Sequence, residues 1–290
     1  MSVIFKTMTV IGVGLIGGSI ARAAKKNGLV AKIIGVGRDE SQLQKAKDLG
    51  VVDETELNLA CAVQNADLIV IATPLGAMSS VFEEIADFIP SDAVITDVGS
   101  SKVSVIANAQ AAFGGTLPAG FVPGHPIAGT EKNGVEASFA ELFENRCTIL
   151  TPTDCSAENA LTRLSKLWQG MGAKIVCMDA KHHDEVLAAT SHMPHVLAFA
   201  LVDTLGQMHE KKEIFQFAAG GFRDFTRIAS SDPTMWRDVC VNNSDALLHV
   251  LDLFRKELDG LESAIKKQDS EYLEKIFNRA KQTRDENVCL

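Results

Sequence analysis

The sequence lacks several features that would place it in a special class. Its six cysteines show no Cys-x-x-Cys spacing, so we expect neither a zinc site nor a redox pair, and we predict reduced, mostly buried thiols. His-Glu-x-x-His is absent, and no metal site is predicted. No apolar run approaches the roughly 18 residues of a membrane helix, and no signal-peptide core opens the chain. We therefore expect a cytoplasmic protein without a membrane partner.

An excess of basic charge is also missing. The 290 residues carry 28 Lys and Arg against 37 Asp and Glu, a formal net charge of −9. This balance disfavours nucleic acid or an anionic membrane as the main partner, but it allows a local basic pocket for a small anionic substrate. The length suits two domains of about 150 residues each.

A glycine-rich segment near the N-terminus predicts a dinucleotide site. The β-branched run 9–11 leads into Gly12, Gly14 and Gly17, and residues of good helix propensity follow. In such a strand-turn-helix unit, the first glycine makes the turn, the second admits a pyrophosphate, and the third lets the helix pack on the strand. The helix N-terminus then faces the phosphates. The predicted cofactor contacts here are Gly12, Gly14, Leu15, Ile16 and Gly17.

The end of the next predicted strand, 31–36, bears on the choice of cofactor. At this point an acid binds the ribose 2′-hydroxyl of NAD+, whereas an arginine favours the 2′-phosphate of NADP+. Gly37 stands where the acid is usual, and Arg38 and Asp39 follow. We predict NAD+ or NADP+, with a slight preference for NADP+ through Arg38 and Asp39. In the alternative interpretation, Arg38 is solvated and Asp39 caps the next helix.

Alternating strands and helices predict the fold of the N-terminal part. Further strands are predicted at 68–72, 94–97, 147–150 and 174–176. Their alternation with helices predicts an α/β fold with a Rossmann-type, doubly wound parallel sheet, whose ligand crevice lies at the carboxyl ends of the strands. Thr73, the segment 97–102 and His125 fall at such ends, and Thr73 is a further predicted cofactor contact.

From Asp179 onwards the sequence predicts helices only. Asp179 and Asp232 are predicted N-caps, and Pro194 should kink the first helix. An apolar seam at spacings of four and three comprises Leu247, Leu251, Phe254, Leu258, Leu261 and Ile265. Such a seam packs within the domain or joins two copies in a homodimer, which we expect. We predict a Rossmann domain over residues 1–178 and an all-helical substrate-binding and dimerisation domain over residues 179–290.

Two strand ends carry candidate catalytic groups. His125, between Gly124 and Pro126, is presented to the crevice, and its ordinary pKa of about 6.5 suits acid-base chemistry near neutral pH. A structural histidine is the alternative. Ser100 and Ser101 are placed to hydrogen-bond a hydroxyl group or a nicotinamide, or to cap the helix that follows.

The helical half carries candidate substrate contacts. His192 and His195 are three residues apart and share a helix face, which favours a pocket-lining role over a metal site. Arg223 and Arg227 are four apart beside aromatic residues. Surface arginines are commonly solvated, but this pair suggests a clamp for a carboxylate.

Several of these motifs, taken in series, resemble the prephenate/arogenate dehydrogenases of tyrosine biosynthesis. The matching segments are 12–19, 97–102, Gly-His-Pro-Ile-Ala-Gly-Thr-Glu at 124–131, Ser-His-Met-Pro-His at 191–195, 220–229 and 232–238. The resemblance implies oxidative decarboxylation of prephenate to 4-hydroxyphenylpyruvate with hydride transfer to NAD(P)+. It places His125 and Ser100 at the ring hydroxyl, Arg227 on the ring carboxylate, and His195, Arg223 and Glu131 around the pocket.

Three alternatives stay open at this point. The substrate can be arogenate, or both compounds in a dual-specificity cyclohexadienyl dehydrogenase. A β-hydroxyacid dehydrogenase shares the general plan but would be expected to use a lysine where His192 and His195 stand. A nucleotide-binding sensor without catalysis is the third alternative, and the joint presence of Ser100, His125 and Arg227 argues against it.

Overall fold

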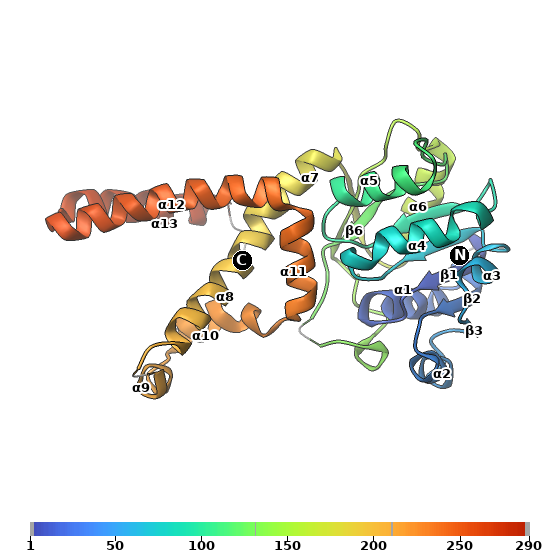
Figure 1. Ribbon diagram of the computed structural model, residues 1–290, viewed down its shortest axis with the longest axis horizontal. Helices are drawn as coiled ribbons and strands as arrows, with labels where there is room; N and C mark the ends of the chain where they lie inside the picture. The colour runs from blue at the N-terminus through green and yellow to red at the C-terminus, as the bar shows by residue number, and fades with distance from the viewer. Residues whose placement is uncertain (1–2, 131, 210, 288–290) are drawn as a thin grey trace. The chain divides into compact units, whose positions relative to one another are not determined.

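The computed structural model describes residues 3–130, 132–209 and 211–287. These form two compact units, Met1–Ser244 and Asp245–Leu290. The domain boundary predicted at residues 178/179 lies inside the first unit, where the strands give way to helices (Figure 1).

A parallel five-stranded sheet forms the centre of the first unit. Its strands are β1 (Phe5–Ile11), β2 (Val30–Val36), β3 (Glu54–Glu56), β4 (Leu68–Ile71) and β5 (Val94–Asp97). The order β3-β2-β1-β4-β5 reverses direction between β1 and β4, so the predicted doubly wound sheet is confirmed. The ends of β1 and β4 meet at this reversal, which is where ligands bind in such sheets.

Helices cover both faces of this sheet. They are α1 (Leu15–Lys26), α2 (Glu40–Asp48), α3 (Leu59–Val63), η1 (Leu75–Ala77), α4 (Met78–Ile85), η2 (Ala86–Phe88) and α5 (Val103–Ala112). Successive residues of β4 alternate between two cores: Val70 packs in one and Ile71 in the other. Because both faces are buried, the strand is apolar throughout, as its sequence predicted.

A second, three-stranded sheet adjoins the first. It contains β6 (Gly124–Pro126), β7 (Cys147–Leu150) and β8 (Lys174–Cys177), with η3 (Val135–Ala137) and α6 (Glu158–Gly170) in its connections. Strand β6 runs antiparallel to β7, and β8 runs parallel to it. The strands predicted at 147–150 and 174–176 are thus confirmed as β7 and β8, but they lie in a sheet separate from the five-stranded one. The Gly124 N–H donates to the side chain of Asp97 at the end of β5 (3.2 Å), and an isolated parallel bridge joins Ile95 of β5 to Phe121, which precedes β6.

The helical part of the first unit follows β8. It comprises α7 (Ala180–Leu187), the π-helical turn η4 (Ala188–His192), α8 (Met193–Gly206), α9 (Lys211–Gln216), α10 (Gly220–Thr226), η5 (Arg227–Ser230) and α11 (Pro233–Asn242). Asp179 accepts from the Lys181 and His182 backbones, and Asp232 caps α11 likewise, so both predicted caps are confirmed. The irregularity expected at Pro194 is the π-helical turn directly before α8.

One helical stretch corrects an expectation from the sequence. The run Ala180–Gly206 is 27 residues long and reaches a mean hydropathy of 1.3 over 18 residues, so it is long and apolar enough to cross a membrane. The sequence predicted no apolar run of this length, but the helix continues without a break from α7 through η4 into α8. Buried hydrogen bonds of its Asp184 and His192 tie this helix to other parts of the first unit. Helices of soluble cores have the same composition, and the stretch is no evidence for a membrane.

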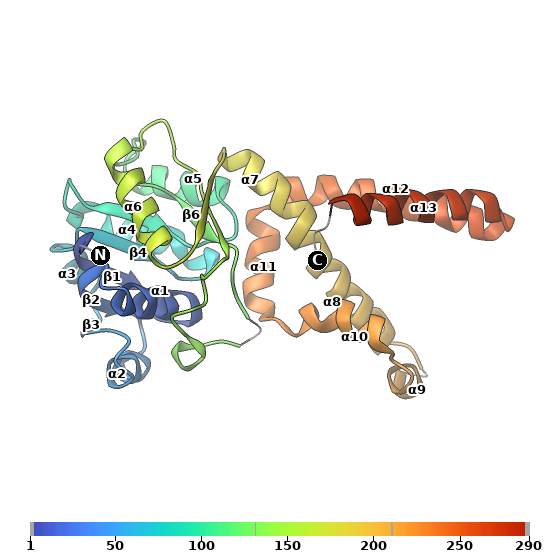
Figure 2. The ribbon, with the colours of Figure 1, turned by 180° about the vertical axis from the view of Figure 1, so that it is seen from behind.

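The second unit is a pair of helices, α12 (Ser244–Lys267) and α13 (Ser270–Asn287), which lie side by side (Figures 1 and 2). An ion pair between Arg279 and Glu257 (3.7 Å) links them. The predicted seam lies on α12, yet Leu258 is 47% and Ile265 is 64% exposed. Part of the seam is therefore uncovered within a single chain.

The cysteines differ from expectation in burial. The five described cysteines are free; Cys61, Cys155 and Cys177 are exposed, while Cys147 and Cys240 are half-buried. The prediction of mostly buried thiols is thus wrong, because Cys61 lies on the surface of α3, Cys155 in the turn before α6 and Cys177 at the end of β8. Cys289 lies outside the described residues.

Candidate active site

The glycine turn between β1 and α1 has the predicted steric form. Gly12 has a φ of +96°, and a Cβ there would lie 2.7 Å from the Ala72 carbonyl oxygen. A Cβ on Gly17 would lie 2.2 Å from the Gly12 oxygen, which no side chain tolerates. The turn and the close helix-strand packing predicted for these two glycines are confirmed.

The same turn leaves room and donors for a phosphate. A Cβ on Gly14 would meet no atom within 4 Å, and helix α1 starts without a side-chain cap. Leu15 and Ile16, in its first turn, are half-buried. The Thr73 hydroxyl, at the end of β4, is buried without a hydrogen-bond partner among the described residues. Open space, uncapped N–H groups and an unpaired hydroxyl fit a dinucleotide pyrophosphate.

At the end of β2, Asp39 caps the next helix, as in the second interpretation given for this segment of the sequence. Asp39 Oδ1 accepts from the Ser41 N–H (2.9 Å), the Ser41 hydroxyl (2.7 Å) and the Gln42 N–H (3.2 Å), and so caps α2. These bonds hold the pKa of Asp39 below its ordinary value. Arg38 is exposed. Asp39 is thus engaged as a cap, and Arg38 is accessible to a ligand.

A buried ion pair fixes the segment that carries His125. Lys102 and Asp97 are fully buried and paired with each other. Lys102 Nζ also donates to the Gly124 carbonyl (2.7 Å), and Asp97 accepts from the Gly99 N–H (2.7 Å). Burial lowers the pKa of Lys102, and the Asp97 charge opposes that effect. Since Gly124 is held at both its N–H and its carbonyl, the position of His125 is defined.

His125 lies in a buried chain of polar groups. Its Nδ1 is 2.9 Å from Nε2 of His183, and Nδ1 of His183 is 2.7 Å from Oδ1 of Asp184. His125 is 9% exposed and His183 is fully buried. Burial places the pKa of His125 well below its ordinary value, and the neighbouring His183 and Lys102 side chains lower it further. His125 is therefore neutral near pH 7 and able to accept a proton.

Asp184 joins this chain to the start of α5. Its oxygens accept from the backbone N–H groups of Lys102 (2.7 Å) and Val103 (2.9 Å) and from the Ser101 hydroxyl (3.0 Å). Burial raises the pKa of Asp184, but the hydrogen bonds from His183 and the two N–H groups outweigh it and keep the pKa below its usual value. Asp184 is ionised and serves as a cap for α5 from another helix.

The two serines therefore differ in position. Ser101 is buried and donates to Asp184 or to the Asn242 carbonyl (3.2 Å). Ser100, the predicted catalytic companion of His125, is half-buried, and its hydroxyl makes no hydrogen bond to a described residue.

His192 adds a third buried imidazole to the cluster. Its Nδ1 accepts from the side-chain amide of Asn243 (3.0 Å), which also donates to the Asp184 carbonyl (2.8 Å). Burial lowers the pKa of His192 to about 4. Because Nδ1 is an acceptor, Nε2 carries the hydrogen, and the backbone of Ser100 is close enough to raise the pKa of His192 slightly against the effect of burial.

His195 contacts the indole ring of Trp236 face to face. It stacks on Trp236 with ring centroids 3.6 Å apart, and its Nδ1 is 2.8 Å from the Ser191 carbonyl. Burial lowers the pKa of His195, and the positive charge of Arg227 adds to this, so Arg227 is close by. The Trp236 indole N–H is buried without a described partner.

The remaining predicted site residues make no hydrogen bond to the histidine cluster in the described part of the chain. Arg223 lies on α10 and Arg227 at the start of η5, and both are exposed. Glu131 lies outside the described residues. The fold thus brings His125 together with His183, His192 and their partners, and Arg227 with His195.

The positions that sequence reasoning missed are Lys102, His183 and Asp184. The consecutive residues His182, His183 and Asp184 were a visible signal, being three titratable groups after a predicted cap. Their contact with His125, 58 residues away, has no local signature.

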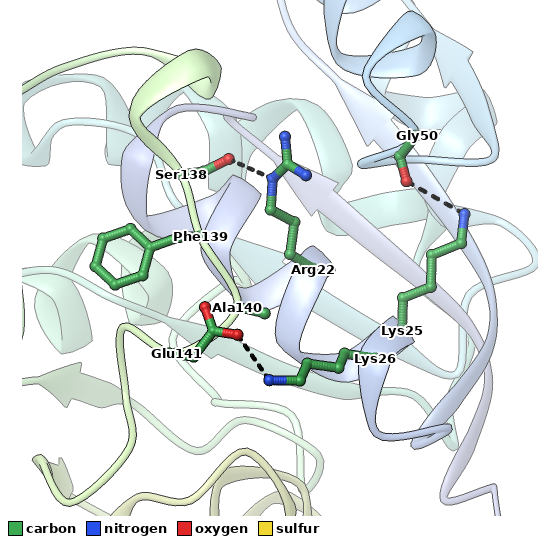
Figure 3. A pocket seen from close by; sticks show the side chains of 8 residues that line it. All are labelled: Arg22, Lys25, Lys26, Gly50, Ser138, Phe139, Ala140 and Glu141. Carbon is green, nitrogen blue, oxygen red and sulfur yellow. Dashed lines mark hydrogen bonds and ion pairs between the residues drawn. The ribbon is translucent and has the colours of Figure 1, made fainter.

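A cavity of about 470 Å³ lies away from this cluster, beside the C-terminal end of α1 (Figure 3). Three cationic side chains line it, but each is already engaged. Lys25 pairs with Asp53, Lys26 pairs with Glu141, and Arg22 donates to the Ser138 hydroxyl (2.9 Å). No group of three or more His, Cys, Asp or Glu side chains within the described ranges could hold a metal.

The doubly wound sheet, its glycine turn and the histidine cluster define a dinucleotide-binding protein of the oxidoreductase class. Residues 20–177 match the family described as "Prephenate dehydrogenase, nucleotide-binding domain", and residues 179–279 match "Prephenate dehydrogenase, dimerization domain". The chain belongs to the prephenate dehydrogenase family.

Relatives of known sequence extend over nearly the whole chain. A cyclohexadienyl dehydrogenase of Zymomonas mobilis is 39% identical over 283 residues, which cover 97% of this chain and 96% of that protein. A prephenate dehydrogenase of Bacillus subtilis is 40% identical over 284 residues, which cover 96% of this chain and 75% of that protein.

Solved structures agree with the fold. A prephenate dehydrogenase of Aquifex aeolicus, in complex with hydroxyphenyl propionate and NAD+, has a TM-score of 0.89 at 34% identity and covers 97% of this chain and 98% of its own. A Synechocystis arogenate dehydrogenase has a TM-score of 0.81 at 30% identity, with coverage of 97% and 100%.

Proposed function

We propose that the chain catalyses the oxidative decarboxylation of prephenate to 4-hydroxyphenylpyruvate, with NAD(P)+ as hydride acceptor, in L-tyrosine biosynthesis. The observation that carries this proposal is a neutral, buried His125 at the end of a strand, in a chain of this family that also has the dinucleotide turn. A base of this kind and an oriented cofactor are all the reaction requires.

The cofactor is held, in this proposal, by the glycine turn and the ends of β2 and β4. Gly12, Gly14, Leu15, Ile16, Gly17 and Thr73 bind its pyrophosphate side, and Arg38 and Asp39 bind its adenosine side. When bound, NAD(P)+ accepts a hydride from C4 of the substrate ring. The exposed Arg38 and the capping role of Asp39 favour NADP+, whereas the Aquifex aeolicus relative was solved with NAD+. Both cofactors remain in the proposal.

His125 acts as the base. Its neutral imidazole accepts the proton of the C4 hydroxyl, and Ser100 hydrogen-bonds the same hydroxyl. Loss of the hydride and of this proton leaves a cyclohexadienone. Departure of CO₂ then gives an aromatic phenolate, which takes the proton back from His125 to form the phenol, and aromatisation drives the reaction. The protein's contribution is orientation and one base of suitable pKa.

The substrate carboxylates are held from the helical side. Arg227 clamps the ring carboxylate, while His195, Arg223 and Glu131 line the pocket. The unpaired indole N–H of Trp236, which stacks on His195, supports this placement, because a buried donor without a partner in the described residues suits a ligand rich in acceptors.

Arogenate is the second candidate substrate. It differs from prephenate only in carrying an amino group in place of the side-chain keto group. The relatives named cyclohexadienyl dehydrogenase and arogenate dehydrogenase favour including it. A dual-specificity enzyme is therefore the alternative form of the proposal.

The proposal extends to assembly and location. We infer a Rossmann domain over residues 1–178, and a helical domain over 179–290 that contributes to substrate binding and joins two copies. The match of residues 179–279 to a dimerisation domain supports this division. A cytoplasmic location follows from the acidic composition and the biosynthetic role.

A four-way rate comparison tests the proposed function. Prephenate or arogenate is combined with NAD+ or NADP+, and the reduced nicotinamide is followed by absorbance. We expect turnover with prephenate, and the fastest combination identifies both substrate and cofactor. Folded protein that binds NAD(P)+ but turns over none of the four combinations would refute the proposed reaction.

A further inference from the structure

We propose that His183 and Asp184 are positioning residues for His125: they fix its tautomer and stabilise the positive charge that it acquires. This inference rests on the proposed function for its kinetic consequence. The three groups form a continuous buried chain, with contacts of 2.9 Å between the imidazoles and 2.7 Å from His183 to the carboxylate.

The acidic end fixes the first hydrogen bond of the chain, and in the proposed arrangement, with His183 neutral, the second follows from it. An ionised carboxylate can only accept, so Nδ1 of His183 carries a hydrogen and donates to Asp184. In the proposed arrangement His183 carries one hydrogen only, so its Nε2 has a lone pair, and Nδ1 of His125 donates to it. Nε2 of His125 is left with the lone pair. The base of the proposed reaction is therefore Nε2 of His125. Its lone pair is set by Asp184, which His125 does not contact.

Asp184 is itself held firmly in place. Besides His183, it accepts from two backbone N–H groups at the start of α5 and from the Ser101 hydroxyl. These bonds keep it charged and prevent rotation. Its orientation is thus tied to α5, which follows the strand β5 at the edge of the crevice.

The chain also has an electrostatic function during turnover. When Nε2 of His125 takes the proton of the substrate hydroxyl, the ring becomes an imidazolium while Nδ1 keeps its hydrogen. The nearby charge of Lys102 opposes this state, as burial does. The Asp184 carboxylate, connected through the polarisable His183 ring, offsets these effects. No proton needs to leave His125 for Asp184 to act in this way.

The substitution His183→Gln separates the role of the chain from simple packing. A glutamine oxygen can accept from Nδ1 of His125 and keep its ring in place, but the link to the Asp184 charge is weakened. The matched control is His182→Gln, since His182 is exposed and adjacent on α7. We expect His183→Gln to lower kcat by about 10- to 100-fold, with KM and NAD(P)+ affinity changed less than about threefold. The control should match the wild type.

Asp184→Asn provides a second variant, with an expected loss in kcat of about 10²- to 10⁴-fold by analogy with carboxylates that orient catalytic imidazoles. A folded His183→Gln protein with kcat within about twofold of the wild type would overturn the inference. An equal fall in substrate and cofactor affinity, with kcat unchanged, would do the same, because it would indicate only a structural role.

The tautomer itself can be measured without any substrate. Imidazole ¹⁵N NMR of the wild-type protein should show hydrogen on Nδ1 and a lone pair on Nε2 of His125. The opposite tautomer would overturn the inference, whichever variants fold. If the wild type turns over none of the four substrate and cofactor combinations, the proposed function fails, while this measurement still decides the tautomer.

Discussion

Individual residues of the cluster have protonation states set mainly by burial. Of the seven histidines, His125, His192 and His195 all have pKa values below the ordinary range, and burial is the largest cause for each. A neutral imidazole can accept a proton or line a pocket for an anionic substrate, but it must be charged once the chain unfolds in mild acid. Burial of these imidazoles therefore has two effects: it keeps the base unprotonated, and it makes the stability of the fold depend on pH.

His192 gives this coupling a measurable form. Its pKa is about 4 in the folded protein and about 6.5 unfolded, so the unfolded chain binds more protons between these values. Stability from this group is complete above pH 6.5 and is lost as the pH falls towards 4. Between pH 7.5 and pH 5, His192 should lower the free energy of unfolding by about 2 kcal/mol.

The change that tests this is His192→Asn, which keeps an acceptor for Asn243 and does not titrate in this range. Denaturant unfolding at the two pH values should show a pH-dependent loss about 2 kcal/mol smaller in the variant than in the wild type. His182→Asn, at an exposed position of α7, is the control and should retain the wild-type loss. Equal losses in all three proteins would rule out a neutral buried His192.

Sequence reasoning reached the residues of the site unevenly. His125 was found because a strand end and two rigid neighbours mark it in the sequence. His183, Asp184 and Lys102 were missed because their importance comes from contacts across 58 or more residues, or from burial of a lysine that looks exposed in a linear reading. Asp39 carried two interpretations, and only the geometry of its three hydrogen bonds shows that it is a cap.

At the scale of elements, the strand-turn-helix unit around Gly14 separates two uses of glycine. Gly17 is required by packing, since a Cβ there would meet the Gly12 oxygen at 2.2 Å. Gly14 has open space around it and a negative φ of −95°, so the fold itself does not require a glycine. An empty space kept beside uncapped helix N–H groups is what ligand binding needs.

Two alanine substitutions should therefore have different effects. Gly17→Ala should lower the free energy of unfolding by about 1–3 kcal/mol, as overpacking of a core does. Gly14→Ala should change it by less than about 0.5 kcal/mol but weaken NAD(P)+ binding about tenfold or more, a loss of at least about 1.4 kcal/mol. Thermal unfolding and fluorescence titration with the cofactor give the two quantities. Unchanged cofactor affinity in Gly14→Ala would contradict a phosphate at this turn.

Helix caps and individual strands could be predicted from the sequence, but the pairing of the strands in the second sheet could not. Both predicted aspartate caps and the parallel strands β1, β2, β4 and β5 were readable from the sequence, because capping and apolar runs act over a few residues. Strands β7 and β8 were readable too, but their pairing with β6 in a separate sheet was not. Pairing between strands is a contact over long sequence separation and leaves no local pattern.

At the scale of the whole molecule, the helical part has apolar surface that a single chain does not cover. On α12, the seam residues Leu258 and Ile265 are seven positions apart and 47% and 64% exposed, and Leu248 on the same helix is 63% exposed. A seam of this spacing is typical of helices that pack against a partner. Together with the match to a dimerisation domain, this surface supports the proposed homodimer.

Charge placed on the seam should therefore separate the copies. We expect the wild type to sediment as a dimer at micromolar concentration and the double variant Leu258→Lys/Ile265→Lys to sediment as a monomer, because burying two ammonium groups without partners costs several kcal/mol. Asp259→Lys, at an exposed position next to the seam, changes the charge by a similar amount and should remain dimeric. Sedimentation velocity measures the three proteins under one set of conditions. A dimeric double variant would place the interface elsewhere, and a monomeric wild type would refute the homodimer, since the uncovered seam would then have no second copy to contact.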